Sequence, residues 1–211
     1  NSSAASDVYK RQMVEDYEII YADPSRPPLS PERTLSGLEP PVEAVLREYR
    51  GWPYIIDLPP QISMDLVADL GTLEYISCNG AINRLTLYSR DLLSGPGPYA
   101  VSLPTQAVLS RKEYPQDEKV IAKVCEVRLG SYIHEVDEAV SYAGLLPELI
   151  CDMGGSAEVL SVGKRRTLLS SESMVEHPFI SRSYVVRAWT RALDEVKACM
   201  RREGFGRAVL R

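Results

Sequence analysis

The stretch Tyr17-Glu18-Ile19-Ile20-Tyr21-Ala22-Asp23-Pro24-Ser25-Arg26 decides which fold we expect. Its apolar residues 19–22 form a short run without polar alternation, which is typical of a parallel strand buried on both faces. Pro24 lacks the backbone N–H that a strand needs, so Asp23 should lie at the carboxyl end of this strand. Ligands of open α/β sheets bind outside the carboxyl ends of the strands, which makes Asp23 a candidate functional residue. The alternative is an acid that only bonds the loop amides after it.

The composition is that of an ordinary globular chain. Of its 211 residues, 45% are hydrophobic and 25% are charged, and no apolar run approaches the length of a membrane span. The cysteines form no Cys-x-x-Cys pair, which argues against a zinc site or a redox motif. They are Cys78, Cys125, Cys151 and Cys199. Reduced thiols are the simplest interpretation, so we expect a cytoplasmic protein without a metal or a membrane partner.

The first residues of the chain look foreign to the fold. Residues 1–12 resemble an in-frame translation of a sequencing adapter and lack the apolar core of a signal peptide. We leave them out of the fold prediction. Met13 is then either a true start or an internal methionine, and the sequence leaves open whether the chain is complete at either end. It does not indicate the oligomeric state.

Residues 13–110 have the pattern of the C-terminal half of a doubly wound sheet. A strand, a helix, a strand, a short helix and a strand precede an expected antiparallel pair. Pro40-Pro41 opens the first helix and Gly51 ends it, while Asn79-Gly80 is typical of a hairpin turn. The expected helices are 42–50 and 63–70, and the expected strands are 19–22, 52–58, 73–78, 82–89 and 99–103.

The polar segment 111–123 contains a proline and predicts a linker, and residues 124–211 predict a small α+β domain. We expect strands at 124–133, 158–162, 167–170, 179–188 and 206–210. One helix or two short helices should cover 137–151, and a helix capped by Thr190 should run to residue 203. Arg182–Arg211 holds 8 Lys and Arg residues against 3 Asp and Glu residues, a net charge of +5. This excess indicates a polyanionic partner or, as the alternative, a solvated helix face.

Several motifs carry a resemblance to a known family. Asp23-Pro24-Ser25-Arg26 after Ile-Ile-Tyr resembles motif IV of class I S-adenosylmethionine-dependent methyltransferases. More narrowly, it is similar to the form found in members that carry a C-terminal THUMP-like domain. Glu135-Val136-Asp137, Ala143-Gly144-Leu145 and residues 202–207 are similar to motifs of that second domain.

The resemblance implies a fold, a cofactor and a substrate class. The fold would be α/β, the C-terminal half of a Rossmann-like methyltransferase sheet followed by a small α+β THUMP-like domain. The chain would be a fragment that lacks the N-terminal cofactor-binding half, with its glycine-rich loop. The intact protein would use S-adenosylmethionine and methylate RNA, either tRNA or rRNA. The alternative is a non-catalytic RNA-binding or interaction module, which Met13 as the true start would favour.

Two sets of candidate site residues follow. Asp23 would accept a hydrogen bond from a target amine, with Pro24, Ser25 and Arg26 on the same rim. A second set of basic residues would contact RNA backbone or, as the alternative, would lie in a solvated turn: Lys164, Arg165, Arg166, Arg187 and Arg191. His134 and His177 have no ligand-spaced partner and should be structural or exposed, and Trp52 and Trp189 should lie in the core.

The sequence also departs from the family. Relatives usually have Val-Lys-Leu-Ser-Pro where this chain has Ile56-Asp57-Leu58-Pro59-Pro60, which reverses a charge. They often have an acidic Gly-Glu pair where this chain has Asn79-Gly80-Ala81.

Overall fold

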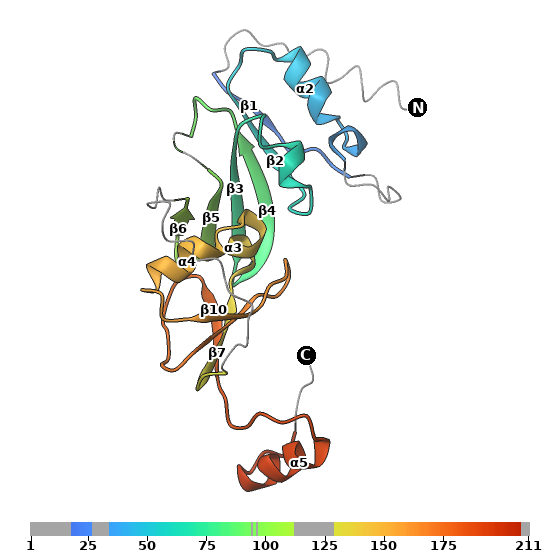
Figure 1. Cartoon of the computed structure of the whole chain (residues 1–211). Coiled ribbons are helices and arrows are strands. Elements are labelled where there is room, and N and C mark those ends of the chain that lie inside the picture. The colour runs from blue at the N-terminus through green and yellow to red at the C-terminus, as the bar shows by residue number, and fades with distance from the viewer. Residues whose placement is uncertain (1–17, 27–33, 94, 96, 112–128, 208–211) are drawn as a thin grey trace. The chain divides into compact units, whose positions relative to one another are not determined.

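The structure is a computed structural model that describes residues 18–26, 34–93, 95, 97–111 and 129–207. It is a mixed α/β structure, as the sequence predicts (Figure 1). The helices are α2 (Val42–Glu48), α3 (Glu138–Ala143), α4 (Leu146–Asp152) and α5 (Leu193–Arg202). The strands are β1 (Ile20–Ala22), β2 (Tyr54–Leu58), β3 (Thr72–Cys78), β4 (Ala81–Tyr88), β5 (Tyr99–Leu103), β6 (Ala107–Ser110), β7 (Tyr132–Val136), β8 (Glu158–Ser161), β9 (Leu168–Ser171) and β10 (Ile180–Val185).

The strands form two sheets, of six strands in the order β1-β2-β4-β3-β5-β6 and of four strands in the order β10-β7-β9-β8. The chain divides into two compact units. Unit 1 comprises residues 1–74 and 84–98, and unit 2 comprises residues 75–83 and 99–211. Only Arg111 of the predicted linker 111–123 is described, so the predicted domain boundary stays a prediction.

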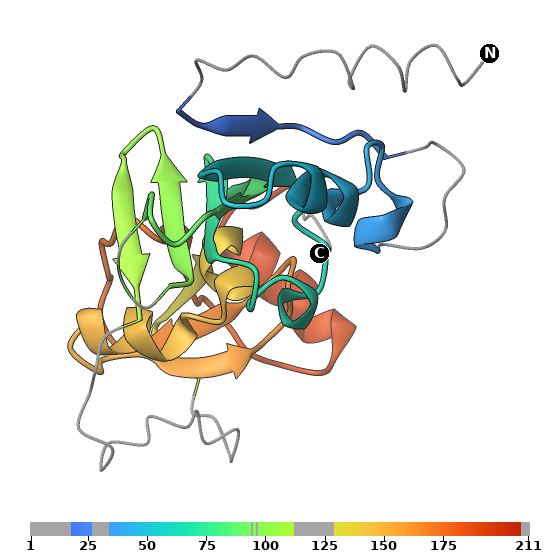
Figure 2. The same cartoon turned by 90° about the horizontal axis from the view of Figure 1, so that it is seen from above.

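In unit 1, β1 and β2 are parallel, as the sequence predicts, and β2 is antiparallel to β4. The predicted burial of β1 is wrong. The strand lies at the edge of the sheet (Figure 2), where 61% of the Tyr21 side chain and 43% of the Ile19 side chain are exposed. An edge strand has a neighbour on one side only, so an unbroken apolar run does not guarantee that both faces are covered.

Unit 1 is held together by apolar residues of α2, β2 and β4 and by Val67, which follows a short 3₁₀ turn. Pro41 precedes the first turn of α2, where its missing N–H leaves no bond unmade. Gly51 follows the helix with a φ of 91°, a conformation that glycine adopts without strain. The core residues are fully or almost fully buried: Val42, Ile56, Leu58, Val67, Leu85 and Leu87. The predicted short helix 63–70 contains a single 3₁₀ turn, Met64–Leu66.

In unit 2, α3 and α4 are the predicted pair of short helices, separated at Gly144, whose φ is 67°. β7 pairs with β9 and β10 in antiparallel fashion, and β5 and β6 form an antiparallel hairpin (Figure 2). Buried residues of both helices and the four-stranded sheet make the core: Val136, Val140, Leu145, Leu149, Leu169 and Phe179.

Some predicted elements of the second half differ from the structure. Strand β6 was not predicted, and the strand expected at 124–133 is found at 132–136, although residues 124–128 lie outside the described part. The N-cap residue of α5 is Ala192 and not Thr190. The hydroxyl of Thr190 instead accepts a hydrogen bond from the Ala192 N–H at 3.0 Å, just before the helix begins. Of the expected strand 206–210, residues 206–207 have no regular structure and the rest is not described.

Among the described helices, none is both long and apolar enough to cross a bilayer. Within the described ranges, no group of three or more His, Cys, Asp and Glu residues lies so that it could hold a metal ion.

Candidate functional site

The four motif residues lie together directly after β1. Asp23 and Arg26 are exposed, and Pro24 is buried behind them. The backbone of Ser25 is fixed by Glu39, because the N–H of each residue donates to the carbonyl oxygen of the other at 2.9 and 2.8 Å. The chain around Asp23 is therefore anchored on both sides, by β1 before it and by this bridge after it.

The sequence did not point to a polar cluster beside this motif, which is built around Asp57 of β2. Asp57 is 8% exposed. Its carboxylate accepts hydrogen bonds from the Tyr21 hydroxyl at 2.8 Å, the Arg84 guanidinium at 2.7 Å and the Thr86 hydroxyl at 2.7 Å. The cluster joins three neighbouring strands, β1, β2 and β4. The acid at position 57 is thus matched by three donors in this chain, and the only sequence signal for the cluster is an acid inside an apolar strand.

Tyr21 links the Asp57 cluster to Asp23. Residues 21 and 23 lie two positions apart along an extended chain, so their side chains project to the same side. The pKa of Tyr21 is raised, first by its hydrogen bond to Asp57 and then by burial, while the negative charges of Asp57 and Asp23 add to the effect and Arg84 opposes it. Two acids, Asp23 and Asp57, therefore lie near the carboxyl end of the parallel pair. Asp57 accepts hydrogen bonds within the sheet, among them one from the Arg84 guanidinium. Asp23 has no hydrogen-bond donor among the described residues, so its oxygens face solvent.

The predicted basic set divides into two groups. Lys164, Arg165 and Arg166 lie between β8 and β9, where the Lys164 Nζ is 5.7 Å from the centre of the Tyr142 ring and the Arg166 Nε is 3.6 Å from Glu135 Oε1. Arg187 and Arg191 follow β10 and are exposed.

The strand register places the neighbours of these two groups near opposite ends of β7. Glu135, which contacts Arg166, pairs with Leu168 near one end of the strand. Val185, which ends β10, pairs with Tyr132 at the other end. The five basic residues therefore belong to two segments, one before β9 and one after β10.

Asp137, the acid of the Glu135-Val136-Asp137 motif, is buried and forms hydrogen bonds within unit 2. Asp137 is 1% exposed and caps α3 by accepting the Ala139 N–H at 2.8 Å. It also accepts hydrogen bonds from the Ser77 hydroxyl at 2.6 Å and the Ser102 hydroxyl at 3.0 Å. Burial raises the pKa of Asp137, and these three hydrogen bonds oppose that rise. The motif therefore joins α3 to β3 and β5.

The two histidines behave as expected, and the two tryptophans do not. His134 is fully buried and bonds the hydroxyls of Ser183 and Ser171 at 2.8 and 2.7 Å, a structural role, and burial lowers its pKa. The prediction that Trp52 and Trp189 lie in the core is wrong, because their side chains are 39% and 73% exposed.

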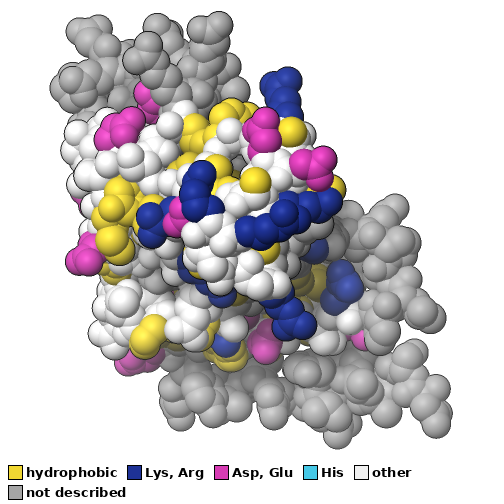
Figure 3. All heavy atoms as spheres, turned by 90° about the horizontal axis from the view of Figure 1, so that it is seen from below, with side chains coloured by type: hydrophobic (Ala, Val, Ile, Leu, Met, Phe, Trp, Pro, Cys, Tyr) yellow, Lys and Arg dark blue, Asp and Glu magenta, His cyan; other side chains and the backbone are white. Residues whose placement is uncertain are grey.

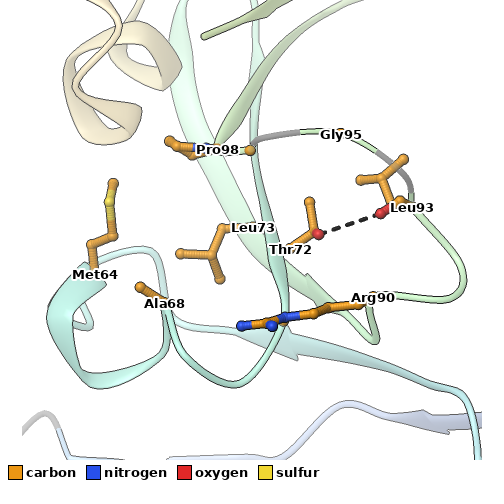
Figure 4. A pocket seen from close by; sticks show the side chains of 10 residues that line it. Met64, Ala68, Thr72, Leu73, Arg90, Leu93, Gly95 and Pro98 are labelled. Atoms are coloured by element: carbon orange, nitrogen blue, oxygen red, sulfur yellow. Dashed lines mark hydrogen bonds between the residues drawn. The ribbon is translucent and has the colours of Figure 1, made fainter.

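Unit 1 contains a small cavity of about 300 Å³ (Figure 4). The side chains of Met64, Ala68 and Leu73 line one part of it, and Arg90 lies along another. Thr72 and Leu93 also line the cavity, and the Thr72 hydroxyl donates a hydrogen bond to the Leu93 carbonyl oxygen at 3.3 Å. None of its lining residues belongs to the Asp23 motif, so this cavity is not part of that site.

The parallel pair β1–β2 and the antiparallel strand β4 beside β2 belong to a mixed α/β fold that is similar to the fold of a methyltransferase. One protein whose structure resembles this chain is a proposed methyltransferase from Porphyromonas gingivalis W83, known from a crystal structure. The two share 18% sequence identity with a TM-score of 0.61, over 87% of this chain and 47% of the other. The chain thus spans about half the length of that protein. No protein-family model matches the sequence, and no curated protein matches it.

Proposed function

We propose that this chain is part of an S-adenosylmethionine-dependent methyltransferase that acts on RNA, with Asp23 at its substrate-facing edge. The observation that carries the proposal is the state of Asp23, an exposed acid held at the carboxyl end of a parallel strand between two anchored segments. Fold likeness to a methyltransferase supports the reaction class. Methyl transfer requires chiefly that a nucleophile be held in line, which a carboxylate on a fixed backbone can do by accepting a hydrogen bond from an amine.

Two cavities of the described residues do not adjoin the Asp23 motif, so neither places a cofactor beside it. Neither the cavity of unit 1 nor the groove of unit 2 described below takes a lining residue from 23–26. The Gly95-Pro96-Gly97-Pro98 stretch is a poor substitute for a glycine-rich binding loop, because its prolines lack backbone donors. Since the chain covers 47% of the protein that it resembles, we propose that the cofactor is held by a part of the intact protein outside this chain.

Sequencing the source DNA upstream of the Met13 codon tests this assignment. We expect the reading frame to continue into an apolar strand, a Gly-x-Gly turn and an acid about 20 residues further on. A stop codon with a ribosome-binding site just before Met13 would reject the enzyme for this gene product. The chain would then be better explained as a non-catalytic RNA-binding module.

The reaction itself is tested with the extended protein and radiolabelled S-adenosylmethionine, using tRNA and rRNA fragments as substrates. Asp23→Asn keeps the shape of the side chain but weakens it as an acceptor, so we expect methyl transfer to fall about 100-fold while cofactor binding is unchanged. Glu43→Gln, an exposed acid on α2, is the matched control and should transfer methyl groups normally. Normal transfer by Asp23→Asn would remove Asp23 from the reaction.

A further inference from the structure

Unit 2 contains an open groove of about 1030 Å³ between the four-stranded sheet and α5. Its lining is largely apolar and includes aromatic side chains, with Tyr184 on β10, Trp189 after it and Phe205 after α5. These three side chains are exposed by 38%, 73% and 55%. Exposed aromatic residues grouped in this way are uncommon on a surface that has no partner.

Helix α5 adds to this apolar surface. Leu193 and Val196 are 66% and 38% exposed, and no residue of the helix is buried. Val196, Cys199 and Met200 line the groove, at the i, i+3 and i+4 spacing that puts them on one helix face. The helix therefore turns its apolar side toward the groove without closing it.

The segment that carries Tyr184 and Trp189 is basic, and this charge favours an anionic occupant over a neutral one, although Glu172 also lines the groove. Arg187 lines it, and Arg191 follows Trp189 by two residues. Within the described part of the chain, residues 182–207 hold seven Lys and Arg residues against three Asp and Glu residues, although the protein as a whole has a net charge of −5. Figure 3 shows Lys and Arg side chains beside exposed apolar ones on one face of the molecule. Aromatic platforms with cations beside them are what binds single-stranded nucleic acid, since bases stack and phosphates pair with arginine.

We infer that this groove binds single-stranded RNA, with a base stacked on Trp189 and the adjoining phosphates paired with Arg187 and Arg191. The inference rests on the proposed function for its choice of RNA, but it assigns binding to this groove and not to the Lys164–Arg166 turn. Tyr184 and Phe205 offer further stacking surfaces along the same groove. The hydroxyl of Tyr184 donates to Glu135 Oε2 at 2.9 Å, which fixes the orientation of that ring.

Fluorescence anisotropy with labelled oligouridine over a salt series tests the site on the 211-residue chain. Stacking on an aromatic ring contributes about 1–3 kcal/mol per base, so Trp189→Ala should weaken binding about five- to 100-fold without changing the salt slope. Arg187→Gln should reduce that slope by about one. Trp52→Phe is the matched control and should bind normally. In that variant Trp189 is the remaining tryptophan, so its emission should be quenched as RNA is added.

Each other result overturns the inference in a distinguishable way. Normal RNA binding by Trp189→Ala, with weak binding by Lys164→Gln, would move the site to the β8–β9 turn and leave RNA as the substrate. Absence of salt-dependent binding by the unaltered chain would remove RNA from the proposed function as well, while cofactor binding by the extended protein would still test the methyltransferase. Sedimentation that shows a dimer broken by Trp189→Ala would assign the groove to a second copy of the chain.

Discussion

Replacing Asp137 by alanine tests whether this acid joins the helices and strands of unit 2. The change removes the N-cap of α3, worth about 1 kcal/mol, and leaves the buried hydroxyls of Ser77 and Ser102 without their charged acceptor. Hydrogen bonds to a charged group contribute about 1.5 kcal/mol each at the low end of their range. Since the change also removes a buried carboxylate, part of this loss is offset. We expect the free energy of unfolding to fall by about 3 kcal/mol.

Urea denaturation followed by circular dichroism measures this loss. With a slope of about 2 kcal/mol per M, the midpoint should fall by about 1.5 M while the slope stays constant. Asp194→Ala is the matched control, because its side chain is 95% exposed, and should change stability by no more than about 0.5 kcal/mol. In a double-mutant cycle, Ser77→Ala should cost much less in the Asp137→Ala background than in the unaltered chain. Additive costs would show that the two side chains do not interact, and would refute the reasoning.

The pH dependence of stability, compared between the unaltered protein and Asp137→Asn, gives a second test. Because burial raises the pKa of Asp137 above its usual value near 3.8, the folded protein takes up a proton at a higher pH than the unfolded chain. The contribution of Asp137 to the free energy of unfolding therefore rises as the pH falls from the raised pKa of the folded protein to the lower pKa of the unfolded chain. The stability of the unaltered protein relative to Asp137→Asn should increase on acidification. A decrease would mean that the three hydrogen bonds outweigh burial.

Three further predictions concern unit 1. Gly71→Ala should destabilise the protein by about 2 kcal/mol or more in urea denaturation, because its new methyl group would overlap the Tyr88 carbonyl oxygen, whereas Gly206→Ala has open space and should be neutral. Burial chiefly raises the pKa of Tyr88 to about 12, so between pH 10 and 12 the unfolded chain loses a proton that the folded chain keeps. The free energy of unfolding should therefore fall over that range, and it should fall less steeply in Tyr88→Phe. Arg84→Ala should cost about 1–2 kcal/mol in thermal unfolding, because Asp57 then keeps a buried charge without its cationic partner, and Arg84→Lys should recover part of the loss.

The sequence predicted the elements of the fold more accurately than their burial. The proline and glycine residues that limit α2 act locally, and so does the Asn79-Gly80 turn, whose φ angles of 53° and 82° are those of a tight hairpin. Whether β1 is buried depends on which strands lie beside it, and a short apolar run carries no information about that. For the same reason the exposure of Trp189 could not be predicted, since it depends on how closely α5 approaches the sheet.

The candidate site was predictable only where its residues are consecutive. Asp23, Pro24, Ser25 and Arg26 stand together in the sequence and in the structure. The Asp57 cluster requires the pairing of Asp57 with Thr86 on another strand, a register that no local pattern specifies. The basic residues were grouped by type, and the order β10-β7-β9 separates them into two groups that a list of charges could not distinguish.

The acids Asp23, Asp57 and Asp137 differ in how many hydrogen bonds their oxygens accept within the fold. Asp57 and Asp137 each accept three hydrogen bonds inside their own unit, so their acceptor capacity is largely used by the fold. Asp23 stands on an equally fixed backbone but has no donor among the described residues. An acid that the fold positions without using its oxygens is the one left available to a substrate. That contrast, rather than the motif alone, is why we propose Asp23 as the acid that contacts the substrate.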